Sequence, residues 1–311
     1  MRAGGTVRNC ATLIYNQNGQ GAEPPLHSDF YLEQWTDPVS RQLIEYCRRY
    51  KGVVARPTFP AGTGYVPGLY KLAGVQPGEE YIIETKLMSS IDNWAARALQ
   101  RMMVDGEPPG KLDSPEALGW CQFLYSLIVR NPEHLVRIKE KLITLNPGEI
   151  LEHVRDDYPN IRGPGDPDNF DDFKAAFIKN PIEVPAVRVL PELVRSERVV
   201  RMLASFKWQT ATVNTAKYPL LTSDCPIIMS NGLIQQDAHI VLPISPRRLF
   251  IATKNEETFQ FFREMNPNEL AEAVNNQVSR QAHRFVFGCD DSQPRFVANR
   301  LGKRVWSSPI G

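Results

Sequence analysis

Four polar residues that lie far apart in the sequence could form one site for an anionic ligand: Arg130, Asp224, Asn275 and Arg284. An aspartate can act as a general base or a metal ligand, and an amide can orient it. Two arginines can hold a phosphate or a carboxylate through paired hydrogen bonds. Ser223 and Trp208 are candidates for contacting a substrate beside this group.

Each of these residues also has a structural interpretation. An aspartate in a strand turn can accept hydrogen bonds from backbone amides and shape the turn. Asn275 shares a helix face with Val278 and Ala282, and a buried amide there needs partners in any case. An arginine at the end of a helix can reach solvent or interact favourably with the helix dipole. The structural interpretation has more support from the residues alone, because the sequence shows no nucleophile–base pair.

Familiar motifs for cofactors, metals and nucleophiles are absent. Gly62, Gly64 and Gly68 do not have the spacing of a dinucleotide-binding or phosphate-binding loop. Residues 166–172 are rich in aspartate but lack the glycine and the final glutamate of a calcium loop, so we interpret them as the acidic start of a helix. The histidines show no metal-binding spacing, and neither GxSxG nor SxxK is present. We expect no metal site, and no cofactor can be named.

The strands that would position Asp224 lie between residues 218 and 253. Short β-branched runs broken by Pro, Gly, Asn and Asp predict paired strands joined by tight turns. Ser223 and Asp224 fall where the first pair is expected to turn. The expected strands are 220–222, 227–230, 239–242 and 249–253, with 208–213 leading into them.

Helical periodicity dominates the middle of the chain. Apolar residues at spacings of three and four predict a helix from 79 to about 105. Ser114-Pro115-Glu116 is typical of a helix start, and the helix that follows, 115–130, is apolar on most sides, so we expect it to be buried. Further helices are predicted at 132–145, 149–157, 166–180, 187–205 and 268–284, a hairpin at 43–47 and 53–55, and short strands at 284–287 and 295–297.

This order of elements predicts the α+β class, with a helical middle section packed on a mostly antiparallel sheet. We expect a single domain over residues 29–302, with a helical part at 79–205 and a sheet-rich part at 206–302. Residues 1–28, rich in Gly, Asn and Gln, are expected to be a disordered arm, and 303–311 a tail.

Composition places the chain among ordinary globular proteins. Hydrophobic residues make up 42% and charged residues 23%. A net charge of +1 gives no strong signal for nucleic acid. The five cysteines form no CxxC pair, and no apolar run is long enough for a membrane span. We expect a soluble, cytoplasmic protein that does not act at a membrane and whose partners are unknown.

Several motifs in the same order resemble a bacterial family known as domain of unknown function 4238. Its members open with His-His-Tyr/Phe-x-Pro-x-Phe-Tyr-Leu, and Phe30-Tyr31-Leu32 matches the second half. The resemblance extends from about residue 30 to 302. The other matching motifs are Thr63-Gly64-Tyr65, Leu69-Tyr70, Ile91-Asp92 with Ala95-Ala96, Arg130-Asn131-Pro132, Trp208, Ser223-Asp224-Cys225-Pro226, Pro243-Ile244-Ser245-Pro246, and Asn275 to Ala282 with Arg284 and Val286.

The chain departs from this family at its start. Where members have the histidines and the proline, this sequence has Glu23, Pro24, Pro25 and Ser28, and His27 is two positions out of register. If those histidines carry a family activity, this chain lacks it. The family itself implies no known activity, so the resemblance selects positions and not a mechanism.

Two classes of function follow from these observations. In the first, the protein is a non-catalytic binding or interaction protein whose Arg/Asp/Asn network fixes the helix–sheet packing. The alternative is a hydrolase-like enzyme acting on a phosphate or carboxylate, with Asp224 as base or metal ligand, Asn275 orienting it, and Arg130 and Arg284 holding the anion. A pocket open to solvent at these residues would favour ligand binding, and a sealed network would favour a structural role.

Overall fold

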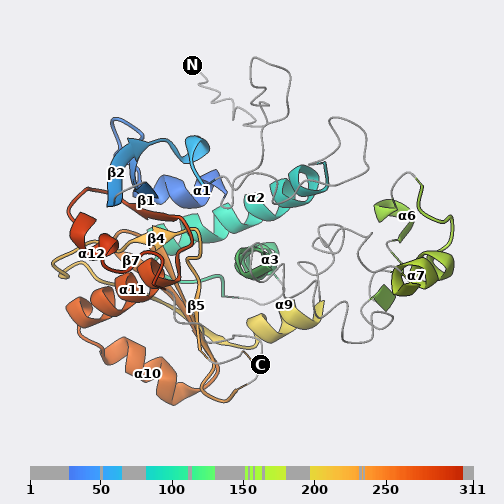
Figure 1. Cartoon of the computed structure of the whole chain (residues 1–311). Coiled ribbons are helices and arrows are strands. Elements are labelled where there is room, and N and C mark those ends of the chain that lie inside the picture. Colours follow the sequence, from blue (N-terminus) through green and yellow to red (C-terminus); the bar gives the residue numbers. More distant parts are fainter. Residues whose placement is uncertain are drawn as a thin grey trace, which may run out of the picture.

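The fold is seen in a computed structural model of the chain (Figure 1). It describes residues 28–49, 52–64, 82–110, 114–129, 151–152, 155–156, 158–162, 165–179, 197–230, 233 and 235–303. Arg130, the predicted helix 132–145 and the predicted N-terminal arm up to residue 27 lie outside these ranges.

Within the described residues, the strands form two four-stranded antiparallel sheets, which confirms the predicted α+β class. The first sheet has the order β2-β1-β8-β4 and the second the order β3-β7-β6-β5. Their bounds are β1 (Leu43–Arg49), β2 (Gly52–Thr58), β3 (Lys207–Thr212), β4 (Thr222–Ser223), β5 (Ile228–Met229), β6 (His239–Ser245), β7 (Arg248–Thr253) and β8 (Phe285–Gly288).

The predicted hairpin of residues 43–47 and 53–55 is confirmed by the β1–β2 pairing, whose strands are longer than predicted. The predicted turn between paired strands at Ser223 and Asp224 is wrong. Here β4 pairs with β8 of the first sheet, and β5 pairs with β6 of the second, so the chain crosses between sheets after Ser223. The sequence pattern pairs neighbouring runs by default, whereas the partner of β4 comes much later in the chain.

The helices have the bounds α1 (Asp29–Leu32), α2 (Ile82–Val104), α3 (Pro115–Val129), α6 (Tyr158–Ile161), α7 (Phe170–Lys179), α9 (Glu197–Ala204), α10 (Glu256–Glu264), α11 (Pro267–Gln281) and α12 (Pro294–Ala298), with single 3-10 turns at η1 (Glu33–Trp35) and η2 (Pro60–Gly62). Helices α2, α3, α7, α9 and α11 coincide with predicted helical segments, whereas α1 and α6 were not expected and residues 155–156 of the predicted helix 149–157 form a turn. The segment predicted as a strand at 295–297 is instead α12, which Pro294 begins in its first turn. Helix α10 was not predicted, although Asn255 caps its first turn by accepting from the Thr258 amide at 2.7 Å.

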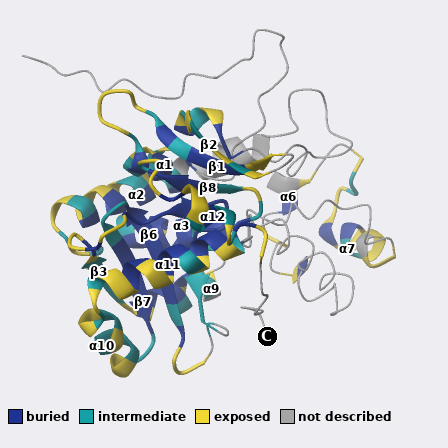
Figure 2. Cartoon of the chain, turned by 60° about the vertical axis from the view of Figure 1, so that its left-hand side comes forward, coloured by how far each residue is buried: buried dark blue, intermediate teal, exposed yellow. Residues whose placement is uncertain are grey.

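Helix α3 forms the centre of the main core, as its composition predicts. Trp120, Phe123 and Leu124 are fully buried. The Trp120 ring meets Phe250 of β7 edge-on, with the ring centroids 5.3 Å apart. Figure 2 shows dark blue, buried residues along α3 and the strands β6 and β7 beside it.

The second sheet is covered on both faces because its strands alternate between two apolar clusters. Ile240, Leu242 and Phe250 belong to the cluster that contains α2, α3 and α9 residues. Val241, Leu249 and Ile251 belong to the cluster that contains the apolar face of α11. The sheet is therefore a buried middle layer between helices (Figure 1).

The short segment α1–η1 joins both sheets through two buried aromatic residues. The Tyr31 hydroxyl bonds Thr222 Oγ1 of β4 at 2.7 Å and donates to the carbonyl oxygen of Pro243 in β6 at 2.8 Å. The Trp35 indole donates to the carbonyl oxygen of Leu220 at 2.9 Å. Through Tyr31, the Phe-Tyr-Leu motif connects β4 of the first sheet with β6 of the second.

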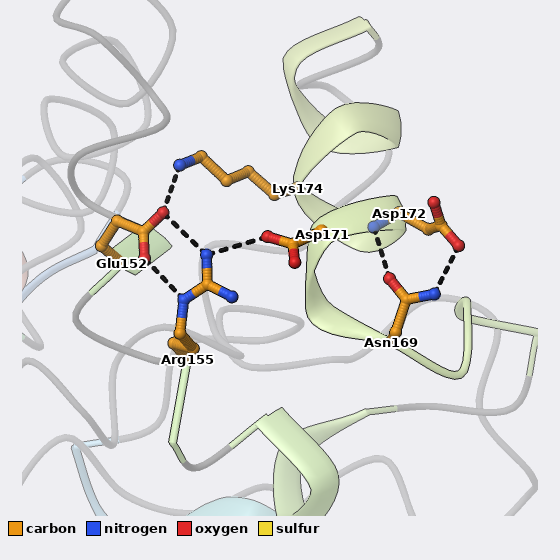
Figure 3. A network of polar contacts seen from close by, with 6 residues as sticks. All are labelled: Glu152, Arg155, Asn169, Asp171, Asp172 and Lys174. Atoms are coloured by element: carbon orange, nitrogen blue, oxygen red, sulfur yellow. Dashed lines mark hydrogen bonds and ion pairs between the residues drawn. The ribbon is translucent and has the colours of Figure 1, made fainter.

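A charged network connects the residues before α6 with α7 (Figure 3). Arg155 Nε donates to Glu152 at 2.7 Å and its NH2 group donates to Asp171 at 2.8 Å, while Lys174 also binds Glu152. Hydrogen bonds from Arg155 and Lys174 lower the pKa of Glu152 to about 2. All four side chains keep contact with solvent, so these ion pairs add little to stability.

The first turn of α7 agrees with the interpretation of residues 166–172 as an acidic helix start. Asn169 Oδ1 accepts from the Asp172 amide at 2.8 Å, and Asp171 and Asp172 occupy the first turn. In the described ranges, no helix combines the length and the apolar character needed to cross a membrane.

Gly119→Ala is expected to destabilise the fold by about 1–3 kcal/mol, because it overpacks the contact between α3 and α2. A methyl group at Gly119 would collide with Cβ of Trp94 and lie 3.2 Å from the backbone nitrogen of Ala95. This cost exceeds the gain of roughly 0.5–1 kcal/mol that alanine brings to a helix interior. Urea unfolding measures the difference. Gly110→Ala, which meets no atom within 4 Å, is the control; equal stability of the two variants would contradict the prediction.

Candidate functional site

Asp224 follows β4 and is 4% exposed. Its Oδ1 accepts from the backbone amide of His283 at 2.9 Å, and its Oδ2 accepts from the amides of Arg284 at 2.7 Å and Phe285 at 3.1 Å. The Asp224 amide donates to the carbonyl oxygen of Phe285 at 3.0 Å. The carboxylate therefore binds three consecutive backbone donors and fixes the segment that leads from α11 into β8.

Asn275 is 2% exposed and satisfies the backbone just before β4. Its Oδ1 accepts from the Leu221 amide at 2.8 Å, and its Nδ2 donates to the carbonyl oxygen of Pro219 at 2.8 Å. The Gln293 side chain donates to the same carbonyl oxygen of Pro219 at 2.9 Å. Further along α11, Gln281 donates to the carbonyl oxygen of Ile227 at 2.8 Å.

The predicted site residues therefore divide into two surroundings. Asp224 and Asn275 are buried and bind backbone groups of segments that are close together, as the sequence suggested for a structural network. Arg284 is joined to Asp224 through its amide, while its side chain is exposed. Arg130 lies outside the described residues, so its relation to the others is not defined.

The two residues proposed to contact a substrate are used in packing and in the turn. The Trp208 indole donates to the carbonyl oxygen of Leu203 at 3.0 Å, and its ring meets Phe250 edge-on with centroids 5.5 Å apart. Ser223 is fully buried, and its Oγ accepts from the Cys225 amide at 3.1 Å.

Arg284 lines a cavity of about 500 Å³ at one end of the first sheet, a site that the sequence did not reveal. We call it the arginine pocket. Four of its lining residues are arginines, contributed by β1, β2 and the start of β8. The lining residues are Cys47, Arg48, Arg49, Arg56, His283, Arg284 and Phe285.

Strand pairing explains how residues from three parts of the sequence reach this pocket. Cys47 pairs with Phe285 of β8, and Glu45 pairs with Arg56 of β2. Paired residues share a face of the sheet, and so do alternate residues of one strand. Cys47, Arg49, Arg56 and Phe285 therefore lie on one face, near the ends of their strands.

Each arginine of the pocket has a different environment. Arg56 Nε donates to Glu45 at 2.8 Å, and Arg48 donates to the carbonyl oxygen of Leu301 at 2.8 Å. The Arg284 guanidinium lies over the Phe285 ring, 5.2 Å from its centroid. Arg49 is exposed and makes no ion pair with any other described residue. The pocket therefore has more positive charge than the single carboxylate of Glu45 offsets.

Glu45, which binds Arg56, is a buried anion, only 1% exposed. Burial by itself would raise the pKa of its carboxyl group, but hydrogen bonds from Arg56 and Thr63 outweigh burial and the pKa is lowered. Its charge is thus retained at neutral pH and is satisfied within the protein.

The chemistry of the pocket suits an anion better than a metal ion. Guanidinium groups are fixed cations that bind carboxylates and phosphates through parallel N–H donors. In the described part of the chain, no group of three or more His, Cys, Asp or Glu side chains is arranged to hold a metal ion. Sequence reasoning missed Arg48, Arg49 and Arg56, whose only signal was their place at the two ends of a predicted hairpin.

Asp224→Ala is expected to lower the free energy of unfolding by about 3 kcal/mol or more, because three backbone donors lose their acceptor and each unmade buried bond costs about 1–3 kcal/mol. Chemical denaturation followed by circular dichroism measures this loss. Asp237→Ala removes an exposed aspartate from a loop and serves as the control. A loss below 1 kcal/mol for Asp224→Ala would show that the carboxylate does not hold this corner.

Glu45→Gln is expected to lower stability at neutral pH, with a difference from wild type that shrinks as the pH falls below 4.5. The folded-state pKa of Glu45 lies below its ordinary value of 4.5, so the stability from its charge is present above that value and is lost as the pH falls through the folded-state pKa. Denaturation curves of both proteins between pH 3 and pH 7 (roughly the range over which carboxylates titrate) test this. A difference that does not depend on pH would contradict it.

Comparison with known proteins places the chain in a family. A family model described as "Protein of unknown function (DUF4238)" matches residues 28–292, which include both sheets, the Asp224 network and the lining of the arginine pocket. Searches of curated proteins and of solved structures found no match. Because the family match spans most of the 311 residues, this protein belongs to the DUF4238 family.

Proposed function

We propose that this protein is a non-catalytic binding protein whose ligand is a small anion held in the arginine pocket. The single observation that carries the proposal is that Arg48, Arg49, Arg56 and Arg284 border one cavity, with Arg49 and Arg56 on the same sheet face. A cluster of guanidinium groups with few matching carboxylates attracts an anionic ligand, which would supply negative charge to it. Glu45 offsets only Arg56.

The Asp224 network supports this function indirectly. By fixing the backbone of residues 283–285, Asp224 sets the direction in which the side chains of His283, Arg284 and Phe285 leave the chain. We propose that Asp224 and Asn275 are positioning residues behind the pocket, and that Arg284 belongs to the pocket itself.

The alternative of a hydrolase with Asp224 as base or metal ligand has less support. A general base must reach the proton that it removes. Both carboxylate oxygens of Asp224 accept from backbone amides, and the residue is 4% exposed. Asp224 is also not among the residues that line the pocket.

We also propose a reducing cytoplasm as the place where the protein works. Cys47, Cys121, Cys225 and Cys289 are all free thiols, and disulfides are rare where thiols are kept reduced.

Isothermal titration with inorganic phosphate at low ionic strength tests the proposed function. We expect saturable binding by the wild type and at least about tenfold weaker binding by Arg49→Ala, since a hydrogen bond to a charged group contributes roughly 1.5–3 kcal/mol. Arg49 is the best choice because it makes no ion pair with other described residues, so its removal leaves no carboxylate unpaired.

Arg263→Ala is the matched control. It removes the same charge from an exposed position on α10, which packs on the second sheet. Equal weakening by both substitutions would mean that only net charge matters and would overturn the pocket. Failure of the wild type to bind phosphate would overturn the proposed function itself.

A further inference from the structure

We propose that the anion bound in the arginine pocket is the phosphate of a nucleotide, whose base packs against Phe285 and Arg284. This inference rests on the proposed function and assigns its ligand class. It follows from the volume of the pocket, from its one aromatic wall and from the different environments of its arginines.

The volume of the pocket is larger than a bare inorganic anion requires. Sites for small organic molecules occupy roughly 300–1,000 Å³ and combine an apolar wall with a few polar groups that fix orientation. The arginine pocket, at about 500 Å³, falls in this range. A ligand that fills it therefore has an uncharged part besides its anionic group.

Phe285 and Arg284 offer a surface for that uncharged part. Phe285 lines the pocket and is half-buried, and its ring lies nearly parallel to that of the fully buried Phe287, with an angle of 17° and centroids 6.2 Å apart. The Arg284 guanidinium lies 5.2 Å from the Phe285 centroid. Aromatic rings and guanidinium planes are the two kinds of side-chain surface on which nucleic-acid bases stack.

The remaining arginines of the pocket differ in whether they can contact the phosphate. Arg49, at the end of β1, shares a sheet face with Phe285 and Arg56 and has its charge available. Arg48, the neighbour of Arg49 in β1, faces the other side of the sheet and donates to the carbonyl oxygen of Leu301, so we do not assign its guanidinium to the ligand. We assign the phosphate to Arg49 and Arg56, which share a sheet face, and the base to the Arg284–Phe285 pair.

A phosphate explains the number of arginines better than a carboxylate does. One guanidinium can satisfy both oxygens of a carboxylate through two parallel hydrogen bonds. A terminal phosphate has three outer oxygens in a tetrahedral arrangement and about two negative charges, so it accepts donors from several directions. Arginines that border one cavity from β1, β2 and the residue before β8 match the second geometry.

The test compares AMP with ribose 5-phosphate, which has the same sugar and phosphate but no base. Isothermal titration of the wild-type protein is expected to show AMP binding about tenfold tighter than ribose 5-phosphate, the gain that stacking of one base provides. In Phe285→Leu this ratio is expected to fall to about one. Phe261→Leu, which changes an exposed aromatic residue on α10, is the matched control and keeps the ratio.

Each outcome decides the inference. Equal binding of AMP and ribose 5-phosphate by the wild type would overturn the nucleotide assignment and leave the anion pocket intact. A tenfold preference that Phe285→Leu does not reduce would show that the base binds elsewhere and would also overturn it. Binding of neither compound, nor of inorganic phosphate, would overturn the proposed function as well. The wild-type comparison holds even if Phe285→Leu does not fold.

Discussion

The carboxylate of Asp224, which accepts hydrogen bonds from the amides of residues 283–285, is the interaction on which the arrangement of the two sheets depends. At this point the chain leaves the first sheet after β4 and enters the second at β5. A crossing of this kind leaves backbone groups without ladder partners inside the protein, and each needs another partner. Gln281 supplies a partner to Ile227 within the crossing and Asn275 to Leu221 just before it, while the Asp224 carboxylate satisfies the facing amides of residues 283–285.

The same interaction relates a buried network to a surface pocket. Asp224 lies in the interior, yet it binds the backbone amides of Arg284 and Phe285, whose side chains line the pocket. One face of the first sheet changes character along its length: Leu43 and Phe287 belong to the core, whereas Arg49 and Phe285 lie where the sheet reaches solvent.

Some features of the fold could be predicted from the sequence and others could not. Local patterns located α2, α3, α7 and α11, and the uninterrupted apolar character of α3 indicated its central position. The polar residues Asp224 and Asn275 were selected with a structural network as the better supported interpretation, and their hydrogen bonds fit such a network. The helix α12 and the partner of β4 were not found, because a short apolar run fits either a helix or a strand and does not name its partner.

The sequence by itself determined the α+β class, the helices α2, α3, α7 and α11, and the family, since these follow from short-range periodicity and from motifs in a fixed order. Only the tertiary structure decided that β1, β2 and β8 share a sheet and bring Arg48, Arg49, Arg56 and Arg284 to one cavity. The hydrogen bond from the Tyr46 hydroxyl to the carbonyl oxygen of Asp290 joins residues 244 positions apart. Pairing over such a separation is chosen by the packing of the whole core, which no local pattern encodes.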